Sequence, residues 1–283
     1  MKITERYINE DLPEHWNVDE SKESFSRLIN HISLTTNFKS FFERELSYPP
    51  LLKAPKNSLV VADIGSGVGW TTSIIASMPE VKKVYSVEPS EKRLSRVPFV
   101  AKHFNVPEDK IILINGNFEN LNIPEKINLA IFSSSFHHCF DNQMPILFEN
   151  LKKILQKESV FEYKDYHNLN KKIVYKGKVL LASEHYVNWM WTARKIQLYY
   201  KNIFNRYFKS INENKEDIKF GQWRSPNKFS GEHHRTKKEI EKIVRDAGFK
   251  YNIIKHSGHS CIGDRWNIES LSVKYYFAVL SLL

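Results

Sequence analysis

The sequence predicts an α/β protein with a doubly wound, seven-stranded, mostly parallel sheet whose last strand is antiparallel. Two observations carry this prediction. Between about residues 58 and 163, short runs rich in β-branched and aromatic residues alternate with helical stretches, which is typical of βαβ units. Near the C-terminus, two further strand-like runs follow a single helix with no helix between them, so these two strands should pair antiparallel.

Five strand-like runs define the predicted parallel part of the sheet. Each is short, rich in Val, Ile, Leu or Phe, and bounded by turn or helix signals. They are Leu59–Ile64, Lys83–Val87, Ile111–Ile114, Leu129–Phe132 and Val160–Tyr163. Because helical stretches separate most of them, neighbouring strands should be joined by helical crossovers and run parallel.

Three helices are predicted between these strands. The first begins near Thr71 and is ended by Pro79, and the second is opened by Ser90 and should be kinked or broken by Pro98. The third runs from about residue 141 to residue 156. Its apolar face is expected to consist of Ile146, Leu147, Leu151 and Ile154.

Residues 232–283 should complete the core with its last helix and last two strands. Thr236 and Glu239 have the spacing of a capping box, and Gly248 is suited to end the helix. The apolar stripe of this helix is Ile240, Ile243, Val244 and Ala247. The strands expected after it are Phe249–Lys255 and Val273–Leu280.

Two regions lie outside the alternation. Residues 1–57 are predicted to form an N-terminal helical cap that packs over the carboxyl edge of the sheet. Residues 164–231 are interpreted as an inserted basic and aromatic subdomain. Within it, 173–180 has the pattern of a hairpin, and about 182–211 has that of a long amphipathic helix. The cofactor-binding part of the core is then 58–163.

Composition narrows the class of protein. With 283 residues, 41% of them hydrophobic, the chain can bury a full core. Cys139 and Cys261 lie far apart and in no metal-like spacing, so neither a disulfide framework nor a metal site is expected. The apolar stretch Val273–Leu283 is too short to span a bilayer. We therefore expect a cytoplasmic protein without a membrane partner.

The net charge of +10 is unevenly distributed. Residues 164–255 hold 21 Lys and Arg against 9 Asp and Glu, whereas residues 1–163 hold 19 against 21. A basic segment of this kind can be a solvated surface, or it can attract an anionic substrate such as a phosphorylated sugar, a nucleotide or a nucleic acid. Both interpretations stay open, and so does the oligomeric state.

A glycine-rich loop, Asp63-Ile64-Gly65-Ser66-Gly67-Val68-Gly69, follows the first strand and opens the first helix. Its glycines allow a tight turn and close backbone approach, while the helix N-terminus offers free N–H groups to a polar ligand. A dinucleotide fingerprint would require a small residue at position 70. Because Trp70 stands there, the pattern argues against a dehydrogenase.

An acidic residue followed by G-x-G-x-G resembles the first motif of the class I, Rossmann-like S-adenosylmethionine-dependent methyltransferases. The resemblance continues at Glu88-Pro89, where the second strand ends and where an acidic residue in this family accepts hydrogen bonds from both ribose hydroxyls. The cofactor-binding residues that it implies are Asp63, Gly65, Ser66, Gly67, Gly69, Glu88, Pro89, Asn117, Phe118 and Ser133.

Three further positions bear on this resemblance. Asn117 stands where the family usually has an Asp that contacts the adenine amino group, and its side-chain oxygen can accept the same hydrogen bond, with Phe118 against the adenine. The segment 133–138, Ser-Ser-Ser-Phe-His-His, resembles an ending common in small-molecule members, and implies that Ser133 lies beside the methionine end. The family's Pro-Gly-Gly turn before strand five is replaced by residues 156–159, Gln-Lys-Glu-Ser. The resemblance covers about 58–163 and 232–283.

Methyl transfer from a sulfonium requires alignment of the nucleophile, and no metal is needed. A hydroxyl acceptor would benefit from a general base at the carboxyl ends of strands four and five. His138 is the predicted base, with a structural or wall-forming role as the alternative, and Asp165 and His167 are weaker candidates. The predicted substrate-binding residues, for which ordinary packing is the alternative, are His137, Tyr186, Trp189, Trp223 and Arg224.

The preferred hypothesis is an S-adenosylmethionine-dependent methyltransferase that acts on oxygen or nitrogen of a small molecule, such as a sugar or a secondary metabolite. A nucleic-acid methyltransferase that uses the basic segment 164–255 is the main rival. Against it, residues 133–136 replace the Asn/Asp-Pro-Pro-aromatic motif of base-amine methyltransferases. A third hypothesis is a catalytically inactive, cofactor-binding partner subunit.

Overall fold

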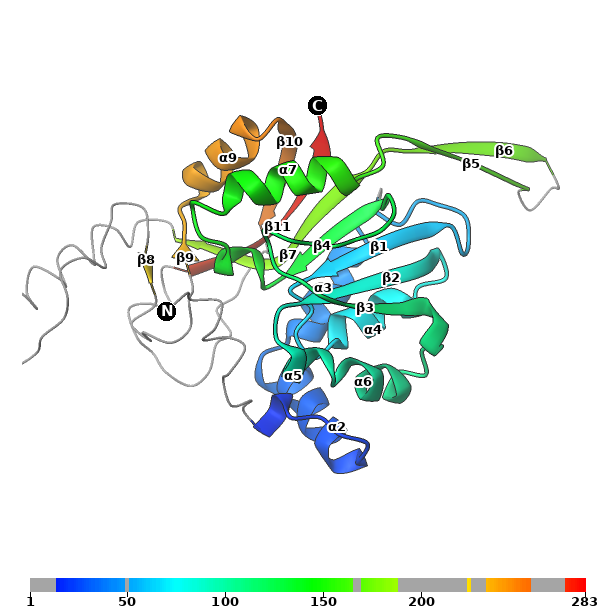
Figure 1. The fold of residues 1–283 in the computed structure, drawn as a ribbon, viewed down its shortest axis with the longest axis vertical. Helices are drawn as coiled ribbons and strands as arrows, with labels where there is room; N and C mark the ends of the chain where they lie inside the picture. The colour runs from blue at the N-terminus through cyan, green and yellow to red at the C-terminus, as the bar shows by residue number, and fades with distance from the viewer. Residues whose placement is uncertain (1–13, 49–50, 165–168, 188–222, 225–232, 256–272) are drawn as a thin grey trace, which may run out of the picture.

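A computed structural model describes residues 14–48, 51–164, 169–187, 223–224, 233–255 and 273–283. Its centre is a seven-stranded sheet with the strand order β10-β11-β7-β4-β1-β2-β3 (Figure 1). The strands are β1 Leu59–Ile64, β2 Val81–Glu88, β3 Ile111–Asn115, β4 Leu129–Ser133, β7 Lys178–Val187, β10 Phe249–Lys255 and β11 Val273–Leu282. β11 runs antiparallel to both of its neighbours, β10 and β7, whereas the other strand pairs are parallel, so the predicted fold class is confirmed.

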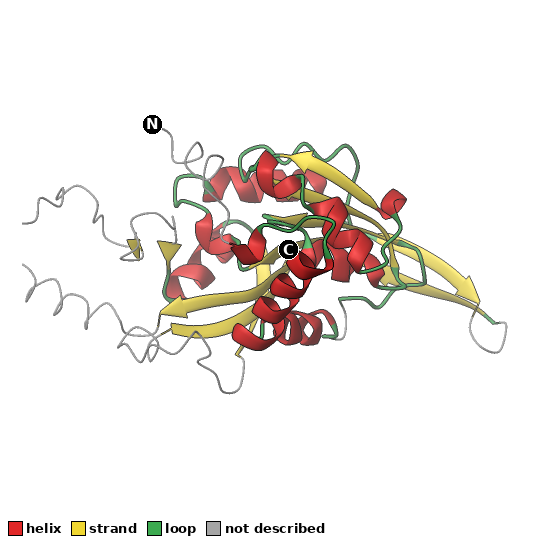
Figure 2. Cartoon of the chain, turned by 90° about the horizontal axis from the view of Figure 1, so that it is seen from below, coloured by secondary structure: helices red, strands yellow, loops and turns green. Residues whose placement is uncertain are grey.

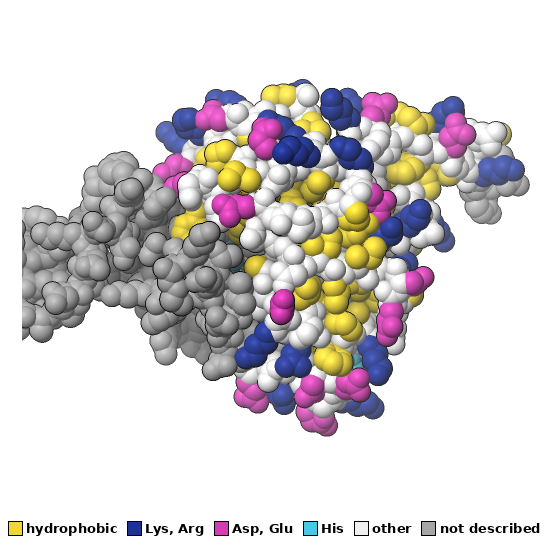
Figure 3. Space-filling model, viewed as in Figure 1, with side chains coloured by type: hydrophobic (Ala, Val, Ile, Leu, Met, Phe, Trp, Pro, Cys, Tyr) yellow, Lys and Arg dark blue, Asp and Glu magenta, His cyan; other side chains and the backbone are white. Residues whose placement is uncertain are grey.

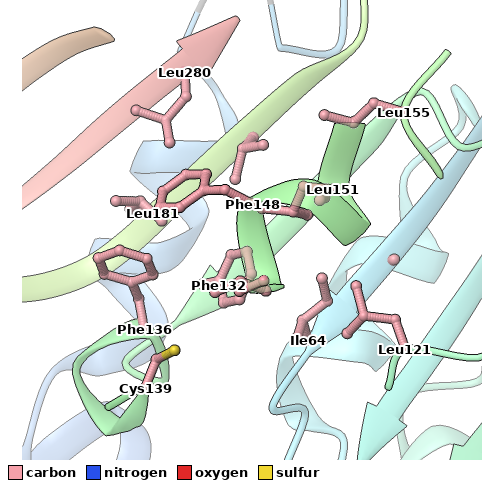
Figure 4. Close-up of a cluster of buried hydrophobic side chains, with 14 of the residues drawn as sticks. Ile64, Leu121, Phe132, Phe136, Cys139, Phe148, Leu151, Leu155, Leu181 and Leu280 are labelled. Atoms are coloured by element: carbon pink, nitrogen blue, oxygen red, sulfur yellow. The ribbon is translucent and has the colours of Figure 1, made fainter. Parts of the chain in front are cut away.

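Helices cover both faces of the sheet, as Figures 1 and 2 show. On one face lie α7 (Met144–Ile154) and α9 (Lys237–Asp246). Alternate residues of the strands, including Phe132 and Leu181, point into this layer and join Phe148 and Leu151 of α7 in one buried cluster (Figure 4). The intervening strand residues point to the opposite face, because side chains alternate along a strand.

The opposite face is covered by α4 (Trp70–Ser77), α6 (Val97–His103) and the N-terminal helices. The N-terminal segment comprises a 3-10 turn η1 (Glu14–Trp16), α2 (Lys22–Asn30), a π-helical turn η2 (His31–Thr35) and α3 (Phe38–Leu46). Phe42 and Leu46 of α3 are fully buried in this second cluster. The segment is therefore helical, as expected, and its burial ties it to the core.

Local signals placed most helix boundaries correctly. Ser90 caps the short α5 (Glu91–Leu94), and α6 begins anew with Pro98 in its first turn, so the predicted break is confirmed. A short 3-10 turn, η3 (Glu108–Lys110), precedes β3. Thr236 and Glu239 form the predicted capping box at the start of α9, and Gly248 follows that helix in the left-handed conformation.

The apolar face of α7 was partly mispredicted. The helix begins at Met144, and its buried residues are Met144, Leu147, Phe148 and Leu151, which have the i, i+3, i+4, i+7 spacing of one face. Ile146 lies off that face and is 44% exposed. The expected stripe therefore included one residue that faces solvent and missed Phe148.

The fifth strand of the sheet was predicted in the wrong place. Val160–Tyr163 belongs to β5 (Ser159–Lys164), which pairs antiparallel with β6 (Asn170–Tyr175) in a separate two-stranded hairpin. This hairpin projects from the body of the molecule (Figures 1 and 2). The position beside β4 is taken by β7, so the expected hairpin over 173–180 and the expected helical start at 182 are both wrong.

The two ends of the projecting hairpin, at Gln156 and Gly177, lie next to each other in space. The N–H of Gly177 donates to the carbonyl oxygen of Gln156 at 3.0 Å, so the backbone meets itself after the excursion. A Cβ atom on Gly177 would lie 2.3 Å from that oxygen, and only glycine fits there. The hairpin thus occupies the turn where the family's Pro-Gly-Gly was expected, and the core sheet extends into the range assigned to the insertion.

The described surface carries charges of both signs. On the face shown in Figure 3, Lys and Arg side chains are interspersed with Asp and Glu, including on the hairpin. Residues 188–222 and 225–232, which carry part of the basic segment and of the predicted amphipathic helix, lie outside the described residues. Within the described part of the chain, none of the helices has the length and apolar character needed to cross a membrane.

Candidate functional site

A cavity of about 270 Å³ lies at the carboxyl edge of the sheet, beyond the ends of β1, β2, β3 and β4. In open α/β sheets this edge is where ligands bind. Each parallel strand contributes the residues that follow it, and the N-terminal helical segment contributes two aromatic side chains. The predicted site residues in the wall are Gly65, Ser66, Gly67, Glu88, Pro89, Asn117, Phe118, Ser133 and His138.

The glycine loop is held against β2 and against the turn after β4. The N–H groups of Gly65 and Ser66 donate to the carbonyl oxygen of Val87 at 2.8 and 3.1 Å. Gly65 has φ +75°, and a Cβ atom there would lie 2.6 Å from Cβ of Ser135. Gly67 also has a positive φ, but nothing lies within 4 Å of its Cβ position. Packing against Ser135 therefore requires a glycine at position 65, whereas the space beside Gly67 is empty.

Asp63 is fully buried and does not line the cavity. Its Oδ2 accepts hydrogen bonds from the hydroxyls of Thr71 and Thr72 at 2.7 and 2.6 Å, which fastens the start of α4 to the end of β1. Burial raises the pKa of this carboxyl to about 6. The structure therefore places Asp63 behind the glycine loop, and it likewise leaves Gly69 out of the cavity wall.

Glu88 ends β2 with its carboxylate at the cavity. Oε2 accepts the N–H of Gly67 at 2.9 Å, and Oε1 accepts the N–H of Ser90 at 3.1 Å. Burial raises the pKa of Glu88, while the positive charge of Arg93, also in the cavity wall, lowers it. Because a carboxylate offers about four acceptor positions, each oxygen can accept one more hydrogen bond.

Asn117 and Phe118 follow β3 and line the cavity. Oδ1 of Asn117 already accepts the N–H groups of Glu119 and Asn120, both at 2.9 Å. An amide oxygen has two lone pairs, so this oxygen is fully used within its own turn, and the side-chain NH2 is the group left for a ligand. The ring of Phe118 lies beside Phe132 with its centroid 6.2 Å away.

The segment after β4 is folded back tightly on the sheet. Ser134 has φ 49°, an uncommon left-handed conformation for a serine, and its N–H donates to the carbonyl oxygen of Ala182 at 2.9 Å. Ser135 donates its hydroxyl to the carbonyl oxygen of Ile64 at 2.6 Å. The 3-10 turn η4 (Phe136–His138) follows at once. Strain of this kind persists only where surrounding contacts hold it.

The two adjacent histidines have different environments. His138 lines the cavity, whereas His137 is 7% exposed and is not part of the wall. Nδ1 of His137 lies 2.8 Å from Oε2 of Glu184, and the two imidazole rings are 4.2 Å apart. The structure therefore does not bring His137 to the predicted substrate position.

Sequence reasoning missed two buried carboxylates that organise this edge. Glu184 of β7 accepts the N–H groups of Ser135 and Phe136, and Glu45 of α3 accepts the N–H of Ser183 at 2.7 Å. These partners are 49, 48 and 138 residues apart in the chain, so no local pattern could reveal them. Trp16 and Phe38, which line the cavity from the N-terminal segment, were missed for the same reason.

The remaining substrate predictions have mixed outcomes. Tyr186 lies in β7, not in a helix, because this part of the chain pairs with β4 and β11. Trp223 and Arg224 form β8, which pairs with β9 (His233–His234), and β9 contacts β7 and η4. Trp189, Asp165 and His167 lie outside the described residues.

The cavity wall fits a polar ligand that carries a diol. Ser133 lines the cavity, and its buried Oγ has no hydrogen-bond partner within the described chain. The open space at Gly67 and the remaining lone pairs of Glu88 lie in the same wall. Across the ranges that the structure describes, no group of three His, Cys, Asp or Glu side chains could hold a metal ion.

The doubly wound sheet and the glycine loop at its carboxyl edge define a Rossmann-like cofactor-binding fold. Comparison with known proteins makes this class more specific. Residues 61–158 match a family model described as a methyltransferase domain. No curated protein matches the chain in sequence.

Solved structures share the fold over nearly the whole chain. A geranyl diphosphate C-methyltransferase from Streptomyces coelicolor A3(2), bound to Mg2+, geranyl diphosphate and S-adenosyl-L-homocysteine, has a TM-score of 0.57 at 11% identity, covering 99% of this chain and 96% of that one. An S-adenosylmethionine-dependent methyltransferase from Clostridium acetobutylicum ATCC 824 has a TM-score of 0.52 at 13% identity, covering 92% and 98%. The DhpI complex with S-adenosylhomocysteine has a TM-score of 0.52 at 9% identity, covering 99% and 97%.

Residues 61–158 are therefore identified as a methyltransferase domain, and the chain shares its fold with S-adenosylmethionine-dependent methyltransferases. The methyltransferase domain and the fold that the glycine loop and the end of the second strand predicted are confirmed. Binding of S-adenosylmethionine by this chain belongs to the proposal below. The roles of individual site residues stay predictions, and they are developed below.

Proposed function

We propose that this protein transfers a methyl group from S-adenosylmethionine to an oxygen or nitrogen atom of a small molecule bound at the carboxyl edge of the sheet. One observation carries the proposal: a single cavity joins the glycine loop, Glu88, Ser133 and His138. Its volume of about 270 Å³ is close to the lower end of the range for small-molecule sites, which begins at about 300 Å³. The geranyl diphosphate C-methyltransferase that shares this fold also acts on a small molecule.

The cofactor would be held by residues from three strand ends. Glu88 would accept hydrogen bonds from the ribose hydroxyls through the lone pairs that Gly67 and Ser90 leave unused. Phe118 would contact the adenine, and the Asn117 side-chain NH2 would donate to one of its ring nitrogens. Ser133 would bind the methionine end through its buried hydroxyl. Bound there, S-adenosylmethionine supplies an electrophilic methyl group.

The acceptor would lie between His138 and the N-terminal segment. Trp16, Phe38 and Phe140 contribute aromatic side chains to the wall, so an apolar or aromatic portion of the acceptor would be desolvated there. His138 is the side chain in the described wall that can take a proton near neutral pH. We assign it the role of general base for a hydroxyl or amine nucleophile.

The test uses S-adenosylmethionine with a labelled methyl group, incubated with the full chain and, separately, with a small-molecule extract and with total RNA and DNA. We expect label in the small-molecule fraction, and His138→Gln should lower its rate of appearance by about 10²–10⁴-fold. The matched control is His103→Gln, because His103 stacks on Phe25 outside the cavity. Label in nucleic acid alone would replace this proposal with the nucleic-acid alternative. Cofactor binding without any transfer would favour an inactive subunit.

A further inference from the structure

Glu184 is a buried acidic residue at the carboxyl end of β7, beside the cavity wall but not in it. Its side chain is 1% exposed, yet it carries a carboxylate in a strand whose neighbouring residues, Leu181 and Ala182, are apolar and fully buried. Burying a carboxylate is costly unless hydrogen bonds compensate for the lost water. Its position therefore calls for an explanation in the groups that it binds.

Three N–H groups of one turn converge on this carboxylate. Oε1 accepts the main-chain N–H groups of Ser135 and Phe136 at 2.8 and 2.7 Å, and Oε2 lies 2.8 Å from Nδ1 of His137. The two main-chain donors are at the N-terminus of η4, so Glu184 caps that turn from across the sheet. Because a carboxylate only accepts, Nδ1 of His137 must carry the proton in this bond.

The capped turn is the one that forms the cavity wall. Ser135 and His138, at its two ends, both line the cavity. Ser135 also donates its hydroxyl to the carbonyl oxygen of Ile64 at 2.6 Å, and its Cβ fills the space beside Gly65. A chain of contacts therefore runs from Glu184 through Ser135 to the glycine loop, and from Glu184 through His137 to the ring of His138.

We propose that Glu184 is a positioning residue of the methyl-transfer site: by binding the N–H groups of residues 135–137, it fixes the turn that sets both His138 and the cofactor side of the cavity. This inference rests on the proposed function. Glu184 touches neither the cavity nor its contents, and acts through Ser135 and His137.

Two substitutions separate positioning from simple stabilisation. Glu184→Gln keeps an oxygen for the two main-chain donors but turns an NH2 group toward His137, so His137 must switch its proton from Nδ1 to Nε2. Glu184→Ala removes all three acceptor contacts. The matched control is Tyr175→Phe, which deletes a buried hydrogen bond of 2.7 Å to the carbonyl oxygen of Leu51, outside the cavity wall.

The experiment measures S-adenosylhomocysteine affinity by calorimetry at a temperature where circular dichroism shows each full-length variant to be folded. The 15N chemical shifts of the His137 ring are recorded in parallel. We expect Glu184→Ala to weaken binding by about 10–100-fold, the loss typical of hydrogen bonds to a charged group, and Glu184→Gln to weaken it by about threefold to tenfold. Tyr175→Phe should bind within twofold of the wild type despite a lower melting temperature.

The outcomes distinguish the two claims. Glu184→Gln that binds S-adenosylhomocysteine like the wild type and keeps His137 protonated on Nδ1 overturns the positioning role, even if Glu184→Ala does not fold. A loss of affinity in Tyr175→Phe as large as in Glu184→Gln also overturns it, because stability alone would then account for the effect. A folded wild type that does not bind S-adenosylhomocysteine contradicts the proposed function instead.

Discussion

The two halves of the site are built in different ways. The cofactor half, around β1 and β2, is built from the glycine loop and from contacts between residues close in sequence. Thr71 and Thr72 bind Asp63, and Glu88 binds Gly67, so each contact joins residues at most 21 positions apart. The acceptor half, around β4 and β7, is held by contacts between residues that are 47 to 138 positions apart. These contacts run from Glu184 to the turn after β4 and from Glu45 to Ser183.

This difference separates what a motif can specify from what the fold must supply. The cofactor half depends on a strand, a turn and a helix in immediate succession, so its geometry follows from local residue types. The acceptor half has no such unit. Its turn is held by the buried carboxylate of Glu184 in β7, and Glu45 of α3 binds Ser183 of the same strand. Substitutions in the cofactor half should therefore affect residues nearby in sequence, whereas substitutions in the acceptor half should affect residues far away in sequence.

Gly65 and Gly67 test how tightly the cofactor half is packed. Both have positive φ, so an alanine at either position pays the cost of the left-handed conformation, about 1–2 kcal/mol. Gly65→Ala would also press its Cβ against Ser135, which adds about 1–3 kcal/mol of overpacking. Urea unfolding should show a loss of about 2–5 kcal/mol for Gly65→Ala and about 1–2 kcal/mol for the control, Gly67→Ala. Equal losses would show that the two halves do not meet at Ser135.

Asp63 gives the cofactor half a pH dependence of its own. Its folded-state pKa of about 6 lies above the ordinary value of 3.8, so the folded state binds the proton more tightly than the unfolded state. The resulting stabilisation is complete below about pH 4 and is lost as the pH rises through 6, by about 3 kcal/mol in total. Asp63→Asn does not titrate.

The difference in unfolding free energy between the wild type and Asp63→Asn should therefore fall by about 3 kcal/mol between about pH 3 and about pH 8. Urea titrations at several pH values measure this difference, and they remove the contributions that both proteins share. A difference that stays constant across this range would mean that Asp63 is not buried behind the loop.

Ser133, at the end of β4, and Ser135, in the turn after it, carry hydroxyls with different surroundings. The Ser133 hydroxyl has no partner within the described chain, so Ser133→Ala should leave unfolding unchanged within about 0.5 kcal/mol while weakening S-adenosylhomocysteine binding by about threefold to tenfold. The Ser135 hydroxyl donates to Ile64, so Ser135→Ala should cost about 1 kcal/mol of stability. Unchanged affinity in Ser133→Ala would remove that residue from the cofactor site.

The sequence was informative wherever the signal was local. β1 was placed to the residue, the break at Pro98 and the capping box at Thr236 were predicted, and β10 and β11 pair antiparallel as expected. The spacing of the glycine loop predicted S-adenosylmethionine as the cofactor. In each case a turn residue, a cap or a short spacing encoded the structure, and tertiary contacts had only to agree with it.

The fifth strand could not be assigned in this way. Val160–Tyr163 follows α7 at a distance typical of a crossover, and its residues favour a strand, which they do form, although outside the sheet. The true fifth strand begins with Lys178-Val179-Leu180-Leu181, a fully buried run after its first residue, and buried strands cannot be told from helices by periodicity. Gly177 directly precedes this strand, but the reason for a glycine there is its close contact with Gln156, which the sequence does not show.

We propose above that the cavity wall around Glu88 binds S-adenosylmethionine. The most direct test of this proposal is the binding of S-adenosylhomocysteine to the wild type, to Glu88→Gln and to the exposed control Glu91→Gln, followed by calorimetry and by the melting temperature. We expect S-adenosylhomocysteine, but not NAD, to stabilise the wild type and Glu91→Gln. Glu88→Gln should weaken binding of S-adenosylhomocysteine by about 10–100-fold. Stabilisation by NAD, or full affinity in Glu88→Gln, would contradict the proposal.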